Sequence, residues 1–294
     1  MNYYFNRNNT LNLRDNFSAE SLIAKLNKFS NEQKGMNVIT MYDGREICST
    51  EVSKVYFNFD FSGFCKDILG EITRYFTPEY FSIRVASGVQ ELRLVGGEVI
   101  IDNEPYKKFI SIINSTDKTR ALTMSVGLMR NKNRAYSILT SFSNKHYKSS
   151  LPDKIKEFSD NLINFNLNID YHIKTIEDLK GKTVSFKDFL RHMMFKTEIG
   201  QEPKPIKTVG LKMRALGYKL IYDMRMYEHR SFLYNCGEFN RFEKYPDFNI
   251  DSKVLYDNYT ACFVENDSSV IARETRRVLD ALSECTEVVP AEVQ

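Results

Sequence analysis

The chain gathers cationic side chains in one stretch, between Pro105 and Lys156. This stretch holds eleven Lys and Arg residues but only two acidic residues, Asp117 and Asp153. Because the whole chain has a net charge of only +3, the remaining residues must be acidic on balance. A basic stretch inside an otherwise acidic molecule predicts a polyanionic partner.

Aromatic residues are interleaved with these cations. Lysine and arginine neutralise phosphates, and exposed aromatic rings stack on unpaired bases, so the combination predicts nucleic-acid binding. We expect Tyr106 and Tyr147 to be exposed because they flank strands, whereas Phe109 and Tyr136 lie within strands and fit a core. A solvated sheet edge guarded by lysines is the alternative interpretation. The expected binding residues are Lys118, Arg120, Arg130, Lys132, Arg134, Lys145, Lys148, Lys154, Tyr106 and Tyr147.

No catalytic signature accompanies the basic stretch. The four histidines do not stand at metal-ligand spacing with a second His or Cys, and no glycine-rich phosphate-binding motif is present. His172 lies beside the apolar face of an expected helix, and we interpret it as a helix-surface residue rather than a ligand. We therefore expect neither enzymatic activity nor a metal or other cofactor. A catalytic site dispersed along the sequence stays open as an alternative.

The cysteines and the hydropathy pattern indicate the compartment. The five cysteines are odd in number and form no CxxC pair, which favours reduced thiols in a cytosol-like environment. No apolar run approaches the length of a membrane span, and the first residues lack the apolar segment of a secretory signal. We therefore expect no membrane association.

The first half of the chain predicts two helices and a set of strands. The apolar spacing predicts helices over residues 18–34, with Ser18 as the cap, and over residues 63–76. Gly96 and Gly97 are expected to form a two-residue hairpin turn. The expected strands cover residues 37–42, 54–61, 80–86, 90–96, 97–102, 107–113, 121–129 and 135–141. From residue 80 onward they predict an antiparallel meander.

The second half predicts mainly helices. Apolar residues three or four positions apart predict one long helix over residues 152–180, packed by Ile155, Phe158, Leu162, Phe165, Ile169 and Ile173. A short helix is expected after Ser185, whose side chain caps it together with Asp188. The fold class is therefore α+β: an antiparallel β-meander with a long packing helix and a helical C-terminal half. The expected organisation is an N-terminal segment over 1–79 that packs on the core, a main domain over 80–285, and a flexible tail over 286–294.

Three landmarks resemble a phage- and plasmid-borne family, the domain of unknown function numbered nine hundred and thirty-two. They are "SIINSTDKTRALTMSVGLMR", "SNKHYKSSLPDKIKEF" and "VLYDNYTACFVEN", and together they cover about residues 80–282. Relative to this family, residues 197–245 look like an insertion. The matching positions are Asn114, Ser115, Asp117, Lys145, His146, Leu255, Tyr256 and Thr260.

The resemblance implies a phage-type protein that acts in DNA metabolism in the cytoplasm of an infected bacterial host. Its layout is also similar to that of phage single-strand annealing proteins, which implies oligomers. The sequence thus favours a cofactor-free protein that binds single-stranded DNA, rather than duplex DNA, in recombination or replication. The alternative is an assembly or host-interaction protein whose basic sheet binds an acidic protein partner.

Overall fold

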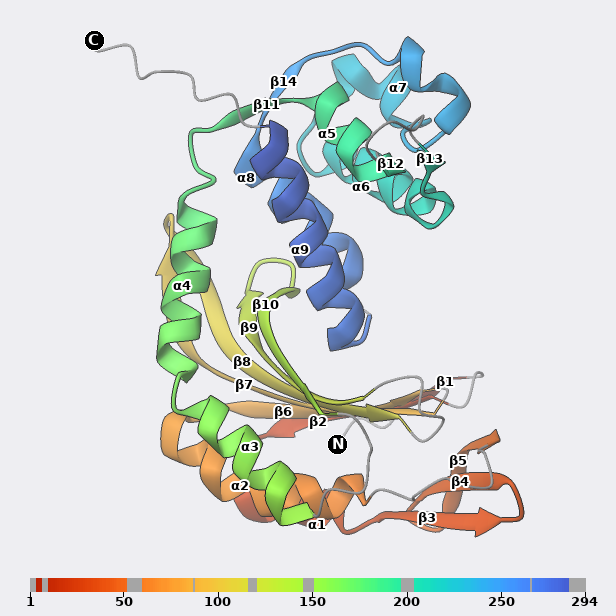
Figure 1. Ribbon diagram of the computed structural model, residues 1–294, viewed down its shortest axis with the longest axis vertical. Helices are drawn as coiled ribbons and strands as arrows, with labels where there is room; N and C mark the ends of the chain where they lie inside the picture. The colour runs from red at the N-terminus through yellow and green to blue at the C-terminus, as the bar shows by residue number, and fades with distance from the viewer. Residues whose placement is uncertain are drawn as a thin grey trace. The chain divides into compact units, whose positions relative to one another are not determined.

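The α+β class is confirmed by the computed structural model of the chain (Figure 1). The structure describes residues 4–6, 10–51, 60–86, 88–115, 121–144, 151–196, 204–264 and 266–285.

The chain divides into two compact units, each assembled from separate segments. The first contains Met1–Asn131, Ile138–His172 and Asp267–Ala272, and the second contains Lys132–Ser137, Ile173–Asn266 and Arg273–Gln294. The boundary expected near residue 80 lies inside the first unit, because β2 from the N-terminal segment pairs with β6. The division into separately folding domains stays a prediction.

The first unit is built on a seven-stranded sheet in the order β1-β2-β6-β7-β8-β9-β10. The pairings from β1 through β9 are antiparallel, so the expected meander is confirmed. Alternate side chains form the core; Leu92, for example, is buried opposite Ile83 and Ile112 on the neighbouring strands. The strands are β1 (Tyr4–Asn6), β2 (Thr10–Asn16), β6 (Tyr80–Ala86), β7 (Val89–Ile101), β8 (Glu104–Ser115), β9 (Leu122–Arg130) and β10 (Ala135–Asn144).

The turn expected at Gly96 and Gly97 is wrong, because both residues lie inside strand β7. The two strands expected on either side are one continuous strand, and the glycines form a bulge within it. A Cβ atom on Gly96 would lie only 2.5 Å from the carbonyl oxygen of Thr77, so the glycine permits close backbone contact. The hairpin turn instead lies at Asp102 and Asn103, which both adopt positive φ, as a tight hairpin turn requires.

A second hairpin explains why the first helix is shorter than expected. Helix α1 (Ala19–Leu26) is capped by Ser18 as expected, but the expected continuation to residue 34 is wrong. The following residues pair across a turn at Gly35, which has positive φ. They form a three-stranded sheet of β3 (Phe29–Lys34), β4 (Asn37–Tyr42) and β5 (Arg45–Glu51). The expected strand over 54–61 falls almost entirely on residues 52–59, outside the described residues.

The long helix expected over 152–180 is broken. Two helices, α3 (Leu151–Leu162) and α4 (Phe165–Glu177), replace it, so the expectation of a single helix is wrong. At the break the backbone N–H of Asn164 bonds to the carbonyl of Asn161, three residues back, in a turn tighter than an α-helix. Asparagine favours such endings because its side chain competes for backbone hydrogen bonds.

The apolar face of these two helices nevertheless packs largely as expected. Phe158 lies against Phe64 of α2 (Phe61–Tyr75), with ring centroids 5.5 Å apart, and Phe165 lies 5.3 Å from Phe76. Among the expected packing residues, four are buried and Ile155 and Ile173 are half-buried. Edge and tilted ring contacts of this kind contribute to the core beyond their buried area.

A buried carboxylate joins three elements of the first unit. Glu91 on β7 accepts hydrogen bonds from Arg93 Nε and Ser111 Oγ, both at 2.8 Å. It also accepts bonds from the backbone N–H of Ser268, at 3.1 Å, and from the Ser268 hydroxyl. Ser268 is the first residue of α9, where backbone N–H groups have no partner within the helix. Glu91 thus fixes the start of α9 against the sheet.

The second unit is mainly helical, which confirms the expected helical C-terminal half. Ser185 caps α5 as expected, since its Oγ accepts the N–H of Asp188 at 3.0 Å. The α-helices are α5 (Phe186–Met194), α6 (Gly210–Tyr222), α7 (Arg230–Leu233), α8 (Ser252–Thr260) and α9 (Ser268–Cys285), of which α9 begins in the first unit. The 3₁₀ turns are η1 (Lys207–Val209), η2 (Tyr227–His229), η3 (Phe239–Lys244) and η4 (Ala261–Phe263).

Two short antiparallel pairings complete the second unit. The paired strands are β11 (Thr183–Ser185) with β14 (Asn249–Asp251) and β12 (Phe195–Lys196) with β13 (Lys204–Pro205). The expected tail over 286–294 lies outside the described residues.

Replacing Phe165 with Ala should lower the free energy of unfolding by about 3–5 kcal/mol, because the ring is 1% exposed and its removal leaves a cavity. Leu167→Ala is the matched control on the same helix. Leu167 is 68% exposed, so its loss should change stability by less than about 0.5 kcal/mol. Urea unfolding followed by circular dichroism measures both, and equal effects of the two substitutions would contradict the packing of α4.

Candidate nucleic-acid interface

In the folded chain, cations of the basic stretch form ion pairs with acidic residues from other segments. Arg130 is only 12% exposed at its side chain and lies 3.5 Å from the carboxylate of Glu104 on the neighbouring strand. Lys107 forms an ion pair with Glu79. The whole first unit contains as many acidic as basic residues, so the net charge of +3 falls in the second unit. At least two cations of the basic stretch are therefore paired with acidic residues from other segments of the first unit.

Tyr106 does not take the exposed position expected for it. It is 2% exposed and belongs to the core. The sequence places the start of the strand at residue 107, but β8 begins at Glu104, so Tyr106 lies inside the strand rather than beside it. It is therefore no base-stacking residue, and that expectation is wrong.

Lys132 and Arg134 are exposed as expected. They lie in the turn between β9 and β10, and Arg134 adopts a φ of 53°. Both belong to the second unit. Other expected binding residues lie outside the described residues, together with the side chain of Lys154, and their role stays a prediction: Lys118, Arg120, Lys145, Tyr147 and Lys148.

The positions that carry the family resemblance are mostly core positions. Asp117, Lys145 and His146 lie outside the described residues. The remaining positions are buried in β8 or α8: Asn114, Ser115, Leu255, Tyr256 and Thr260. Burial suits landmarks that specify a fold, and it does not make these side chains available to a ligand.

A group of cations that the sequence analysis missed surrounds Glu274 on α9. Apolar residues three or four positions apart, Ile271, Val278 and Leu282, define the buried face of this helix. Glu274 lies on that face and is 1% exposed. An acidic residue on an apolar helix face needs partners, and this spacing is the signal that could have identified the site.

Three helices supply those partners. The carboxylate of Glu274 lies 2.5 Å from Lys212 Nζ of α6, 3.1 Å from Arg273 Nε and 3.2 Å from Arg277 Nη1. The hydroxyl of Tyr259 on α8 donates a hydrogen bond to the same carboxylate at 2.7 Å. We call Lys212, Arg273 and Arg277 the cation cluster.

Glu274 keeps its charge in this setting. Burial alone would raise the pKa of its carboxyl group, but hydrogen bonds from Lys212 and Tyr259 and the charges of Arg277 and Lys212 outweigh burial and lower the pKa below its usual value. Burial and the adjacent carboxylate also raise the pKa of Tyr259 far above its usual range, so its hydroxyl stays a donor. With three cations around one anion, the cation cluster and Glu274 together carry a formal charge of +2.

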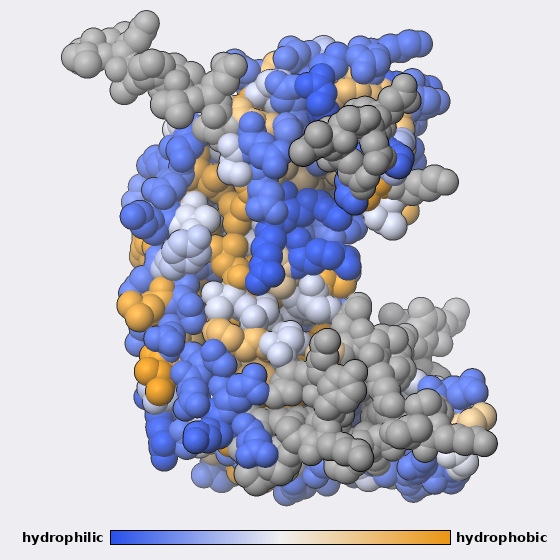
Figure 2. Space-filling view, in the orientation of Figure 1, coloured by the Kyte–Doolittle hydropathy of each residue, from blue (hydrophilic) through white to orange (hydrophobic). Residues whose placement is uncertain are grey.

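The cluster has an outward side. The side chain of Arg273 is more than half exposed, and Arg276 is exposed one turn of α9 away. Figure 2 shows hydrophilic residues along α9 on the visible face. An arginine held by a carboxylate on one side and open to water on the other can donate hydrogen bonds to a phosphate.

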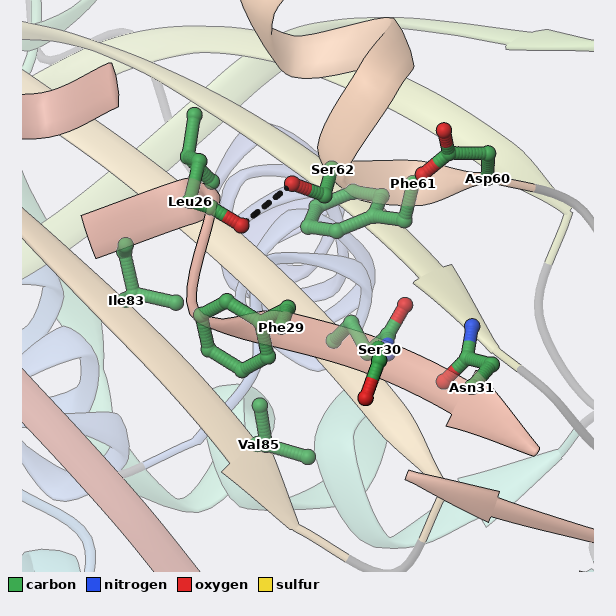
Figure 3. A pocket seen from close by; sticks show the side chains of 10 residues that line it. Leu26, Phe29, Ser30, Asn31, Asp60, Phe61, Ser62, Ile83 and Val85 are labelled. Atoms are coloured by element: carbon green, nitrogen blue, oxygen red, sulfur yellow. Dashed lines mark hydrogen bonds between the residues drawn. The ribbon is translucent and has the colours of Figure 1, made fainter. Parts of the chain in front are cut away.

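The first unit contains a small pocket of different character (Figure 3). Its empty volume is about 370 Å³, including space that is open to solvent, and Phe29, Ile83 and Val85 form an apolar wall. Ser62 at its rim donates a hydrogen bond to the carbonyl of Leu26 at 2.6 Å. Asp60 accepts the N–H of Gly63 at 2.8 Å and so caps α2. No cation lines the pocket in the described residues, which makes it unsuited to phosphate.

The described residues contain no group of three or more His, Cys, Asp or Glu side chains placed to hold a metal ion. His172 is buried, not on the helix surface as expected, and burial lowers its pKa to about 3, so it is neutral. All five cysteines are free thiols. Among the helices that the structure describes, none combines the length and the apolar character needed to cross a bilayer.

Comparison with known proteins gives no match: no family model, no curated protein and no solved structure matches the chain. The resemblance to the family of unknown function therefore stays a prediction.

Glu274→Gln should destabilise the protein by about 1.5–3 kcal/mol at pH 7, because hydrogen bonds to a charged group are lost while the cations remain together. The folded-state pKa of Glu274 is lowered, so its contribution is present above the ordinary value and is lost as pH falls through the folded-state value. Unfolding measured from pH 7 to pH 3 should show parent and variant converging toward low pH.

Asp280→Asn on the exposed side of the same helix is the control and should change stability by less than about 0.5 kcal/mol. A constant difference between parent and Glu274→Gln at every pH would contradict an ionised Glu274.

Proposed function

We propose that the protein binds nucleic acid through the phosphate backbone, without a cofactor, and that its second unit makes the contact. The cation cluster is the observation that carries this proposal. Lys212 and Arg273 come from two helices, 61 positions apart in the sequence, and share the single buried carboxylate of Glu274.

Such an arrangement is prepared for a polyanion before it binds. The carboxylate fixes the cations in place, so less side-chain freedom is lost when a phosphate arrives. One anion among three cations leaves positive charge to attract the phosphate. Release of counterions from the nucleic acid then supplies much of the affinity.

The charge balance of the second unit supports the same proposal. The first unit is neutral by residue count, and the whole net charge of +3 belongs to the second unit. Lys132 and Arg134 add two exposed cations to that unit. The expected role in recombination or replication of phage DNA, the expected oligomer and the bacterial cytoplasmic location remain part of this proposal, because they rest on the family resemblance alone.

An acidic protein partner is the second candidate, since exposed arginines bind carboxylates as well as phosphates. In that case the chain would serve phage assembly or contact a host protein. A repeating phosphate backbone fits a cluster of several cations better than a single carboxylate does, and this favours nucleic acid.

Replacing Arg273 and Arg276 together with Gln should weaken DNA binding at every sequence and reduce the salt slope of binding by up to about two units, one for each lost phosphate contact. Replacing Lys132 and Arg134 together should act in the same direction. Fluorescence anisotropy of a labelled oligonucleotide, titrated at several salt concentrations, measures the slope.

The control removes two exposed arginines from the neutral first unit, Arg45→Gln with Arg74→Gln, and should leave affinity and slope nearly unchanged. If the parent protein binds no DNA at low salt, the proposed function is wrong. If it binds and all three double variants lose equal affinity, the contact is not specific to the second unit.

A further inference from the structure

Four tyrosines crowd together on the surface of the second unit. Tyr218 and Tyr222 belong to α6, Tyr227 to η2, and Tyr234 follows α7; their exposed fractions lie between 36% and 57%. We call these four the tyrosine surface. Tyrosines are usually at least half-buried, so four exposed rings in one small region need an explanation.

Three of the rings contact one another. Tyr218 and Tyr222 are within 11° of parallel, and Tyr234 stands edge-on to Tyr218 at a centroid distance of 5.5 Å. The hydroxyls of Tyr222 and Tyr234 are hydrogen-bonded at 2.7 Å. This bond raises the pKa of Tyr222 above the ordinary tyrosine value, which already leaves the phenol uncharged at neutral pH. The rings thus form an ordered and neutral aromatic surface.

Helix α6 has apolar residues on two faces, and its outer face has no covering element within the described residues. Its inner face packs Met213, Leu216 and Leu220 into the unit. Its outer face presents Leu211, 77% exposed, and then Tyr218 and Tyr222 at helical spacing. A helix that is apolar on both faces is normally covered on both.

The charge around the rings selects the kind of partner. Arg225 and Arg230 are exposed, and in the described part of the chain neither forms an ion pair. Of the nearby acidic residues, Asp223 forms an ion pair with Lys219 at 3.4 Å, which leaves Glu228 beside the two arginines. Rings with free arginines beside them, in the unit that holds the net positive charge, complement a polyanion with flat apolar groups.

We infer that the tyrosine surface stacks the unpaired bases of a single-stranded nucleic acid whose phosphates bind the cation cluster and Arg225 and Arg230. This inference rests on the proposed function and adds its site for bases. Helix α6 carries both parts, since Tyr218 and Tyr222 follow Lys212 by about 9 and 15 Å along the helix axis. A duplex hides the faces of its bases, so the site discriminates between the two forms.

Tyrosine fluorescence follows this contact, because the chain has no tryptophan to mask the emission of its 17 tyrosines. Comparison with variants assigns the change in emission to the tyrosine surface. Three proteins are compared with the parent. The first carries Tyr218→Leu, Tyr222→Leu and Tyr234→Leu, and the second carries Phe at the same three positions. The third, Tyr171→Leu, removes a tyrosine of α4 that is similarly exposed but lies outside the tyrosine surface.

Each protein is titrated with a single-stranded oligonucleotide and with its duplex. We expect the single strand to quench the emission of the parent, and the triple Leu variant to bind it about tenfold more weakly for each base that loses its ring. The Phe variant keeps the rings and should bind like the parent, as should Tyr171→Leu. Binding of the duplex should be alike in all four. Circular dichroism should show the same fold in each, because the replaced side chains are exposed.

The outcomes separate this inference from the proposed function. If the parent binds neither form at low salt, both are wrong. If the parent binds the single strand and the triple Leu variant binds it equally well, the tyrosine surface has no role in stacking, although the proposed function stands. If sedimentation shows that the Leu substitutions abolish self-association but leave DNA affinity unchanged, the surface is an interface between copies of this chain, and the inference is overturned.

Discussion

The second unit depends on one buried carboxylate, that of Glu274. A charged group removed from water is unstable unless hydrogen bonds and opposite charges replace the lost hydration. Lys212, Tyr259 and Arg277 meet this need from three helices, so α6, α8 and α9 can pack together only in an arrangement that brings all of them to one point. The positions of the exposed cations then follow from the packing of the core. The buried carboxylate thus determines where positive charge lies on the surface of the second unit.

Glu91 in the first unit is buried in the same way but has different consequences. Its partners are two serine hydroxyls, a backbone N–H and the guanidinium of Arg93, which is itself buried. The charges of Glu91 and Arg93 neutralise each other, and both groups are buried, so this ion pair presents no charge to the solvent. Glu274 has more cations than it can neutralise, and some of them face outward. The excess of cations over the single carboxylate separates a structural ion pair from a potential binding site.

Local sequence patterns predicted those elements whose stability is local. Strand β6 and the cap of α5 by Ser185 follow from alternation and from a capping residue, and both are confirmed. The turn at Asp43 and Gly44, both with positive φ, carries a standard hairpin signal that the sequence analysis did not use, and β5 was missed with it. Gly96 resembled a turn, but its role depends on the distant backbone of Thr77.

The candidate site was harder to predict because charge is compensated across strands and helices. Arg130 belongs to a run of cations in the sequence, yet Glu104, which forms an ion pair with it, comes from another strand. The opposite holds for Lys212, which stands apart in the sequence and joins Arg273 and Arg277 only in the folded unit. Net charge counted along a window of sequence therefore overestimates the exposed positive charge of the basic stretch. The same count does not detect the cation cluster, whose lysine lies far from its two arginines in the sequence. Spacing on α9 could have identified Glu274, but not the helix that supplies its lysine.

The hydrogen bond between Glu91 and Ser268 also bears on how the chain folds during synthesis. The two residues are 177 positions apart, so the strands that surround Glu91 leave the ribosome long before its helix partner does. Until then only Arg93 and Ser111 bond the carboxylate, and the site of the Ser268 N–H is left to water. Although domains often fold in order from the N-terminus, this hydrogen-bond network is complete only after almost the entire chain has been made. Contacts of such long range also slow folding, because the chain must close a long loop before the contact forms.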